Sequence, residues 1–220
     1  MVPAASRHSP LPTVFVVDDE PAVRKALARV LRAMDIKVAQ FGSAEEFIAA
    51  HDPAAPGCLL LDVAMPGLNG LELQRTLAVR DGALPIIFLS GCAEVPISVQ
   101  AMKAGAVDFL TKPVPDEVLL AAVRAAFRKD RVARSARTAV AAIEARLATL
   151  TPREREVLDH VVAGQLNKQI ADDLGAAEQT IKIHRGRMMG KMKVQSVAEL
   201  VRLIEHLRIS APKAHRTKVS

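Results

Sequence analysis

The stretch VFVVDDEPAVRKAL, residues 14–27, places four apolar residues directly before three consecutive acids, of which the first two are Asp18 and Asp19. A continuously apolar run is typical of a strand that is buried on both faces of a parallel sheet. Pro21 suits the first position of a helix. The stretch therefore predicts a strand, an acidic turn and a helix, which together form one unit of an α/β fold.

This alternation recurs along the first half of the chain. Apolar runs occupy residues 13–17, 37–41, 58–61, 85–89 and 107–110. Helical patterns cover residues 21–34, the segment after the capping box Ser43-x-x-Glu46, residues 70–80, residues 95–103 and the chain from Asp116 onward. Five such repeats predict an α/β fold, a flavodoxin-like doubly wound parallel sheet of five strands with right-handed crossovers.

Polar residues stand where these strands end. Asp18 and Asp19 follow the first strand, Asp62 the third, Ser90 the fourth and Lys112 the fifth. Each alone is an ordinary turn residue. However, ligands of open α/β sheets bind beyond the carboxyl ends of the strands, so we expect these side chains to converge. Clustered carboxylates need a compensating cation, and this set of residues predicts Mg²⁺ beside an aspartate that becomes phosphorylated.

The motifs LLLDVAMPGLNGLEL, FLSG and AMKAGAVDFLTKP, with the acids after the first strand, resemble the receiver domain of two-component response regulators over residues 12–128. The resemblance implies that Asp62 accepts a phosphoryl group from a sensor histidine kinase. It also implies that Asp19, Asp62 and the backbone carbonyl of Ala64 bind Mg²⁺, while Asp18 assists through water. A magnesium-dependent phosphoacceptor is thus the expected function of this half of the chain.

Four further residues have roles that the receiver resemblance implies. Ser90 would donate a hydrogen bond to a phosphoryl oxygen, and Lys112 would neutralise the phosphoryl charge. Ser90 and Phe109 would form a switch pair, although plain core packing is the alternative for Phe109. The Lys112–Pro113 pair resembles a cis-proline turn of the family.

The charge of the chain is divided unevenly. Residues 1–125 contain 11 Lys and Arg against 14 Asp and Glu, a net charge of −3, whereas residues 126–220 contain 19 against 10, a net charge of +9. This asymmetry indicates an anionic partner, such as nucleic acid, for the C-terminal part. Two cysteines are too few for a disulfide scaffold. The absence of a long apolar run predicts a cytoplasmic protein without a membrane partner.

Residues 129–149 contain neither Gly nor Pro and predict a helical linker. Apolar residues recur at helical spacing along this segment and directly after it, at Val132, Ala136, Val140, Ile143, Leu147 and Leu150. Two interpretations remain open, a solvated spacer and a dimerising stripe that the alanines make shallow.

Residues 150–210 predict a bundle of four short helices. Thr151, Pro152 and Glu154 start the first helix, Gly164 and Gly175 end the first two, and a further capping box starts at Ser196. Two short helices joined by a tight turn predict a helix-turn-helix. The segments LTPREREVLDHVVAGQLNKQIADDL and TIKIHRGRMMGKM resemble the LuxR-type helix-turn-helix of the NarL/FixJ group. The remaining residues, 211–220, predict a basic disordered tail.

The third helix of this bundle is expected to enter the DNA major groove. Winding residues 178–193 at 100° per residue puts the predicted DNA-binding residues on an outward face or at the helix start: Thr180, Lys182, Ile183, Arg187 and Lys193. The sequence departs from the family at two positions. Ala177 replaces a capping serine, and Gly186 stands where a side chain often reaches a base.

These features predict a DNA-binding response regulator rather than an enzyme. The expected partners are a sensor histidine kinase, double-stranded DNA with an inverted repeat, a second copy of the chain on phosphorylation, and RNA polymerase for activation of transcription. One alternative is an enzyme with an aspartyl-phosphate intermediate, but the chain has a basic helix-turn-helix in place of a substrate cap. Another is a regulator that does not depend on phosphorylation, against which the complete set of receiver residues argues.

Overall fold

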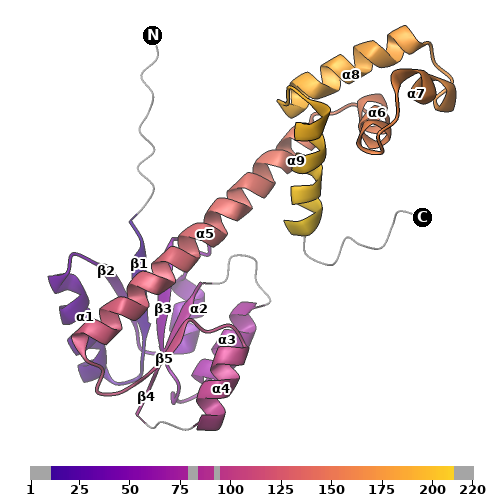
Figure 1. Ribbon diagram of the computed structural model, residues 1–220. Helices are drawn as coiled ribbons and strands as arrows, with labels where there is room; N and C mark the ends of the chain where they lie inside the picture. Colours follow the sequence, from indigo (N-terminus) through magenta and orange to yellow (C-terminus); the bar gives the residue numbers. More distant parts are fainter. Residues whose placement is uncertain (1–10, 79–83, 92–94, 211–220) are drawn as a thin grey trace, which may run out of the picture. The chain divides into compact units, whose positions relative to one another are not determined.

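The computed structural model describes residues 11–78, 84–91 and 95–210 (Figure 1). The contacts within the chain form two compact units that meet between Arg134 and Ser135. The predicted basic tail lies outside the described residues. No helix within the described ranges combines the length and the apolar character that a membrane span requires.

The first unit is built on a parallel sheet of five strands. These are β1 (Thr13–Val17), β2 (Lys37–Phe41), β3 (Gly57–Asp62), β4 (Ile86–Ser90) and β5 (Asp108–Thr111). They lie in the order β2-β1-β3-β4-β5, and every neighbouring pair is parallel. The predicted flavodoxin-like doubly wound sheet is confirmed.

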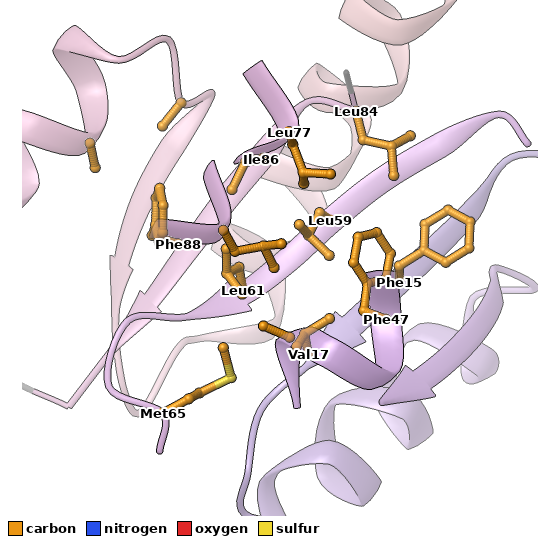
Figure 2. Close-up of a cluster of buried hydrophobic side chains, with 14 residues drawn as sticks. Phe15, Val17, Phe47, Leu59, Leu61, Met65, Leu77, Leu84, Ile86 and Phe88 are labelled. Atoms are coloured by element: carbon orange, nitrogen blue, oxygen red, sulfur yellow. The ribbon is translucent and has the colours of Figure 1, made fainter. Parts of the chain in front are cut away.

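Helices cover both faces of this sheet. They are α1 (Pro21–Ala33), α2 (Ala44–Ala50), α3 (Gly70–Ala78), α4 (Val95–Lys103) and α5 (Asp116–Ala148). α2, α3 and α4 pack on one face, in a core that contains Phe15, Leu59 and Phe88 (Figure 2). α1 and the first part of α5 pack on the other face, in a core that contains Val14 and Leu60. Because successive strand residues face opposite cores and both cores are buried, the strands are nearly continuously apolar.

The helix α5 is tied to the first unit beyond residue 128, where the sequence predicted the domain to end. Asp130 on this helix is only 3% exposed and accepts a hydrogen bond from the backbone N–H of Gly57 at 3.0 Å. It pairs with Arg134 at 2.8 Å. Arg134 in turn donates to the backbone carbonyls of Ala54, at 2.8 Å, and Ala55. The buried acid, the arginine and the segment before β3 thus form one hydrogen-bonded clamp.

We expect Arg134→Ala to destabilise the first unit by about 2 kcal/mol, because it leaves Asp130 buried without its cation. The loss should be smaller than for a fully buried pair, since 23% of the Arg134 side chain is exposed. Calorimetry of the full-length protein measures the effect. Arg137→Ala is the matched control, because it removes an exposed arginine from the same helix. Equal melting of the two variants would show that the clamp contributes no stability.

The second unit is a helical bundle. Its helices are α6 (Pro152–Val162), α7 (Asn167–Asp173), α8 (Glu178–Met192) and α9 (Val197–Ser210). The side chain of Thr151 accepts the N–H of Glu154 at 3.3 Å, and the Glu154 carboxylate accepts the N–H of Thr151 at 2.9 Å, which confirms the predicted capping box. Gly164 and Gly175 have φ values of 86° and 59°, a left-handed conformation that ends α6 and α7.

The predicted linker stripe is divided by the structure. Ile143 and Leu147 are buried in the core of the second unit, so they are not available for a dimer contact. Val132 is 68% exposed, Ala136 is exposed and Val140 is half-buried. The stripe as a whole is therefore neither a solvated spacer nor a dimerising seam. Its last two turns belong to the helical bundle, because the bundle needs their apolar side chains to close its core.

Candidate functional site

The carboxyl ends of β1 and β3 bring three aspartates together. These strands are neighbours, and Val17 is paired with Leu61, so Asp18 and Asp62 follow at the same level of the sheet. Carboxylate oxygens of Asp18, Asp19 and Asp62 lie within 4.8 Å of one another. Asp18 and Asp62 are buried, whereas Asp19 is exposed. The structure thus joins three acids that the sequence located at the ends of two separate strands.

Lys112 reaches this cluster from the residue after β5. Its backbone N–H donates to the carbonyl of Ser90 at 2.7 Å, and the Lys112–Pro113 peptide bond is cis, as the resemblance implied. Its ammonium group lies 2.7 Å from Asp18 Oδ2 and 3.0 Å from Asp62 Oδ1. Only 19% of the Lys112 side chain is exposed, so these contacts are poorly screened by water.

The electrostatics of the cluster favour a bound cation. Burial raises the pKa of Asp62 above its ordinary value, and this outweighs the hydrogen bond from Lys112. The charges of Asp18 and Asp19 raise it further. Burial alone would lower the pKa of Lys112, but its hydrogen bonds to Asp18 and Asp62 raise it instead. The Lys112 ammonium contacts Asp18 and Asp62 but is the partner of only these two of the three carboxylates, which leaves negative charge among oxygen donors of the kind that suits Mg²⁺.

The loop between β3 and α3 carries Ala64, which is exposed. Glu45 on α2 accepts the backbone N–H of Leu68 at 3.1 Å and so ties this loop to α2. A Cβ atom at Gly70 would lie 2.4 Å from the carbonyl oxygen of Asp62, so only glycine lets α3 begin this close to Asp62. The sequence analysis missed Glu45 and Gly70. A glycine at the start of a predicted helix was the available signal for a close backbone approach.

The predicted switch residues lie on β4 and β5. Ser90 is buried at the end of β4 and pairs with Thr111. Phe109 is half-buried, and its ring centroid lies 6.1 Å from that of Phe88. Phe109 therefore packs against the core, as its alternative interpretation required. Its switching role stays a prediction.

The second candidate site is the outward face of α8, the orange helix of the second unit in Figure 1. Thr180, Lys182, Ile183 and Arg187 are all exposed on this helix. The opposite face is buried in the core of the unit, through Ile181, Met188 and Met192. An exposed basic face on the second helix of a helix-turn-helix suits contact with DNA phosphates and base edges.

Three details of α8 bear on the sequence expectations. Ala177 precedes the helix without a side-chain cap, as predicted. A Cβ atom at Gly186 or Gly190 would meet nothing within 4 Å, so packing does not require these glycines. Lys193 lies outside the helix, which corrects its assignment to the helical face. The chain adopts a left-handed conformation at Lys193, with φ of 55°, because the helix closes there.

The sequence analysis also missed Gln179, which is exposed in the first turn of α8. It lies three and four residues before Lys182 and Ile183, so all three share one face of the helix. The amide of a glutamine can bind adenine through two hydrogen bonds, which makes this residue a candidate base contact. The available signal was its spacing from Lys182 and Ile183, which places it on the same helical face.

A doubly wound domain with this acid and lysine cluster, followed by a helix-turn-helix, defines the class of two-component response regulators. Residues 14–124 match the response regulator receiver domain, and residues 148–204 match the bacterial regulatory proteins of the luxR family. The chain therefore belongs to the response regulators that combine a receiver domain with a LuxR-type DNA-binding domain.

Known relatives agree with this assignment over nearly the whole chain. Nodulation protein W of Bradyrhizobium diazoefficiens is 46% identical over 206 residues, which cover 94% of this chain and 91% of the relative. The transcriptional regulatory protein FixJ of Azorhizobium caulinodans is 42% identical, covering 86% of this chain and 90% of the relative. A solved structure of the response regulator StyR matches with a TM-score of 0.81 and 42% identity, covering 89% of this chain and 98% of that one. The chain is thus a transcriptional response regulator.

Proposed function

We propose that Asp62 accepts a phosphoryl group from the phosphohistidine of a sensor kinase. The observation that carries this proposal is the buried Asp62 carboxylate, 3.0 Å from the Lys112 ammonium and within 4.8 Å of two further acids. A carboxylate oxygen of Asp62 attacks phosphorus, a P–O bond forms, and the P–N bond of the donor breaks. Positioning and neutralisation of oxygen charge supply most of the catalysis in such a transfer.

The neighbouring residues have distinct roles in this proposal. Asp19 and Asp62, with the backbone carbonyl of Ala64, would hold Mg²⁺, and Asp18 would contribute through water. When bound, the ion supplies positive charge that offsets the phosphoryl oxygens. Lys112 neutralises the same oxygens, and Ser90 donates a hydrogen bond to one of them. The excess of carboxylates over cations in the cluster supports the metal assignment.

We further propose that phosphorylation favours a dimer through α4, β5 and α5. Four large apolar side chains are exposed on α4 and on the first turn of α5: Val95, Val99, Met102 and Val118. Val95 is 71% exposed, and together with its apolar neighbours it offers a surface that a partner could cover. Movement of Ser90 toward the phosphoryl group, with Phe109 following, would alter this surface. Receiver residues 12–128 would then control DNA binding by residues 150–210 through the helix between them.

The dimer would bind an inverted repeat whose half-sites lie roughly one helical turn, ~10 bp, apart. The proposed site of action is the cytoplasm, where the kinase, the DNA and RNA polymerase are available. Selection of bound DNA from a random pool, with and without acetyl phosphate, tests the function. Phosphorylated protein should enrich an inverted repeat, and light scattering should show a doubled mass. Enrichment that ignores phosphorylation would contradict the proposed control.

Replacing Lys182 with Ala should cost on the order of 1 to 3 kcal/mol in binding and relax the sequence preference at one position. The reason is its exposed position early in α8, where side chains reach base edges. Ile183 would touch a thymine methyl group, Thr180 and Arg187 would contact the backbone, and Lys193 would bind a phosphate. Lys193→Ala is the contrasting variant, which should weaken all sequences alike and reduce the salt dependence. Titrations at two salt concentrations measure both effects, and indifference to Lys182→Ala would move the base contacts elsewhere.

A further inference from the structure

The two ends of α8 are held differently. At its start, Ala177 offers no side-chain cap. At its end, Arg146 of α5 donates a hydrogen bond from Nη1 to the backbone carbonyl of Met192 at 3.2 Å. Carbonyls at a helix end lack partners within the helix, and a cation there also complements the helix dipole. The last turn of α5 therefore caps the C-terminal end of α8.

Two further contacts join the end of α8 to the chain between α5 and α6 and to the first turn of α6. Lys191, in the last turn of α8, donates to the carbonyl of Thr149 at 3.0 Å and pairs with Glu154 at 2.6 Å. Glu154 is buried, and the hydrogen bond from Lys191 lowers its pKa, with the backbone N–H of Thr151 acting in the same direction. The end of α8 is thus attached on one side to α5 and on the other to the start of α6.

The apolar contacts follow the polar ones. Ile143 and Leu147 lie on the same two turns of α5 as Arg146, and both are buried in one core with Met188 and Met192 of α8. These two turns of α5 therefore pack directly against the end of α8. A displacement of these turns must displace the end of α8, because close-packed side chains transmit small shifts.

We propose that Arg146 is a positioning residue for DNA recognition, which sets the orientation of α8 from the end of the linker helix. The inference rests on the proposed function, because it takes α8 to be the DNA-reading helix. Arg146 touches no DNA in this proposal. It fixes the C-terminal end of α8, and the orientation of α8 in turn sets the position of Lys182 and its neighbours. It also gives the linker helix a direct contact with α8.

The test uses the full-length protein with Arg146→Ala, Arg146→Lys and the control Arg137→Ala, which removes an exposed arginine from the same helix. Binding is measured on a selected operator and on scrambled DNA of equal length. Arg146→Ala should weaken operator binding about fivefold more than it weakens scrambled binding. Arg146→Lys keeps the charge and one donor, and it should restore most of this ratio. If Arg146→Ala lowers both affinities by one factor, as is expected for Arg137→Ala, Arg146 contributes only general positive charge and the proposal is overturned.

A second measurement does not depend on DNA. The amides of Lys193 and Val194 donate to the carbonyls of Gly190 and Met189 and close the end of α8. Their hydrogen exchange, followed by NMR, should become about fivefold faster in Arg146→Ala and stay unchanged in Arg137→Ala. Unchanged exchange in Arg146→Ala overturns the proposal. If exchange changes as expected while the wild type shows no sequence preference, the proposed DNA function fails and the capping role of Arg146 stands.

Discussion

Asp62→Asn is expected to abolish phosphorylation of the protein by acetyl phosphate. The asparagine amide lacks the negatively charged oxygen that attacks phosphorus. The substitution also removes one of the carboxylates that would hold Mg²⁺. Wild-type protein should gain one phosphoryl group in the presence of Mg²⁺, and chelation with EDTA should prevent the gain. Intact mass is the suitable measurement, since a chain without Trp or Tyr has no useful intrinsic fluorescence.

The control for this experiment is Asp172→Asn, which changes an exposed aspartate of the second unit. It should be phosphorylated at the wild-type rate. Circular dichroism should show that both variants keep their helices and strands. A phosphoryl group that persists on Asp62→Asn would mean that another side chain is the acceptor, with exposed Asp19 the next candidate.

The fold and the cluster of acids with Lys112 were accessible from sequence for one physical reason. Parallel strands buried on both faces must be nearly continuously apolar, so each polar residue after a run marks a strand end. Strand ends of a doubly wound sheet share one edge, which makes the convergence of Asp18, Asp62 and Lys112 predictable without coordinates. The predicted strand boundaries agree with the structure within one residue, which was sufficient to locate the acids at the strand ends.

The features that escaped prediction depend on contacts between residues far apart in the chain. The Asp130 and Arg134 clamp binds backbone groups near Gly57, and no pattern in α5 distinguishes these residues from its solvated charges. The linker stripe was ambiguous because an apolar spacing predicts a buried face but not the partner that covers it. Ile143 and Leu147 were covered by the helical bundle of the same unit.

The end of helix α8 was also predicted incorrectly from the sequence. A helical wheel assumes that the helix continues, so it assigned Lys193 to the face of α8 although the chain leaves the helix there. Gly70 is a position where a helical pattern does not reveal the constraint, because the structure requires that no side chain be present. Its requirement arises from the Asp62 carbonyl, which lies in another element.

Lys112→Ala should slow phosphorylation of Asp62 by acetyl phosphate by ~10²–10³-fold, comparable to the loss of a preorganised group that stabilises developing oxygen charge. The ammonium lies 2.7 Å from Asp18 and 3.0 Å from Asp62, so its removal also leaves two buried carboxylates without their cation. Burial already raises the pKa of Asp62, and without Lys112 the pKa should rise further and reduce the fraction of reactive carboxylate at neutral pH. Rapid-quench mass measurements at saturating Mg²⁺ give the rate.

Thermal melting of Lys112→Ala, with and without Mg²⁺, separates the role of the Lys112 charge in phosphorylation from its role in stability. Loss of the cation should lower the melting temperature at neutral pH, and Mg²⁺ should restore much of it, because the ion binds the folded acid cluster and stabilises by mass action. Lys25→Ala removes an exposed lysine from α1 and should leave both the rate and the magnesium dependence of melting unchanged. A Lys112→Ala protein that phosphorylates as fast as wild type would assign charge neutralisation to the metal alone. Lys112 would then serve only to hold Asp18 and Asp62 together before the ion binds.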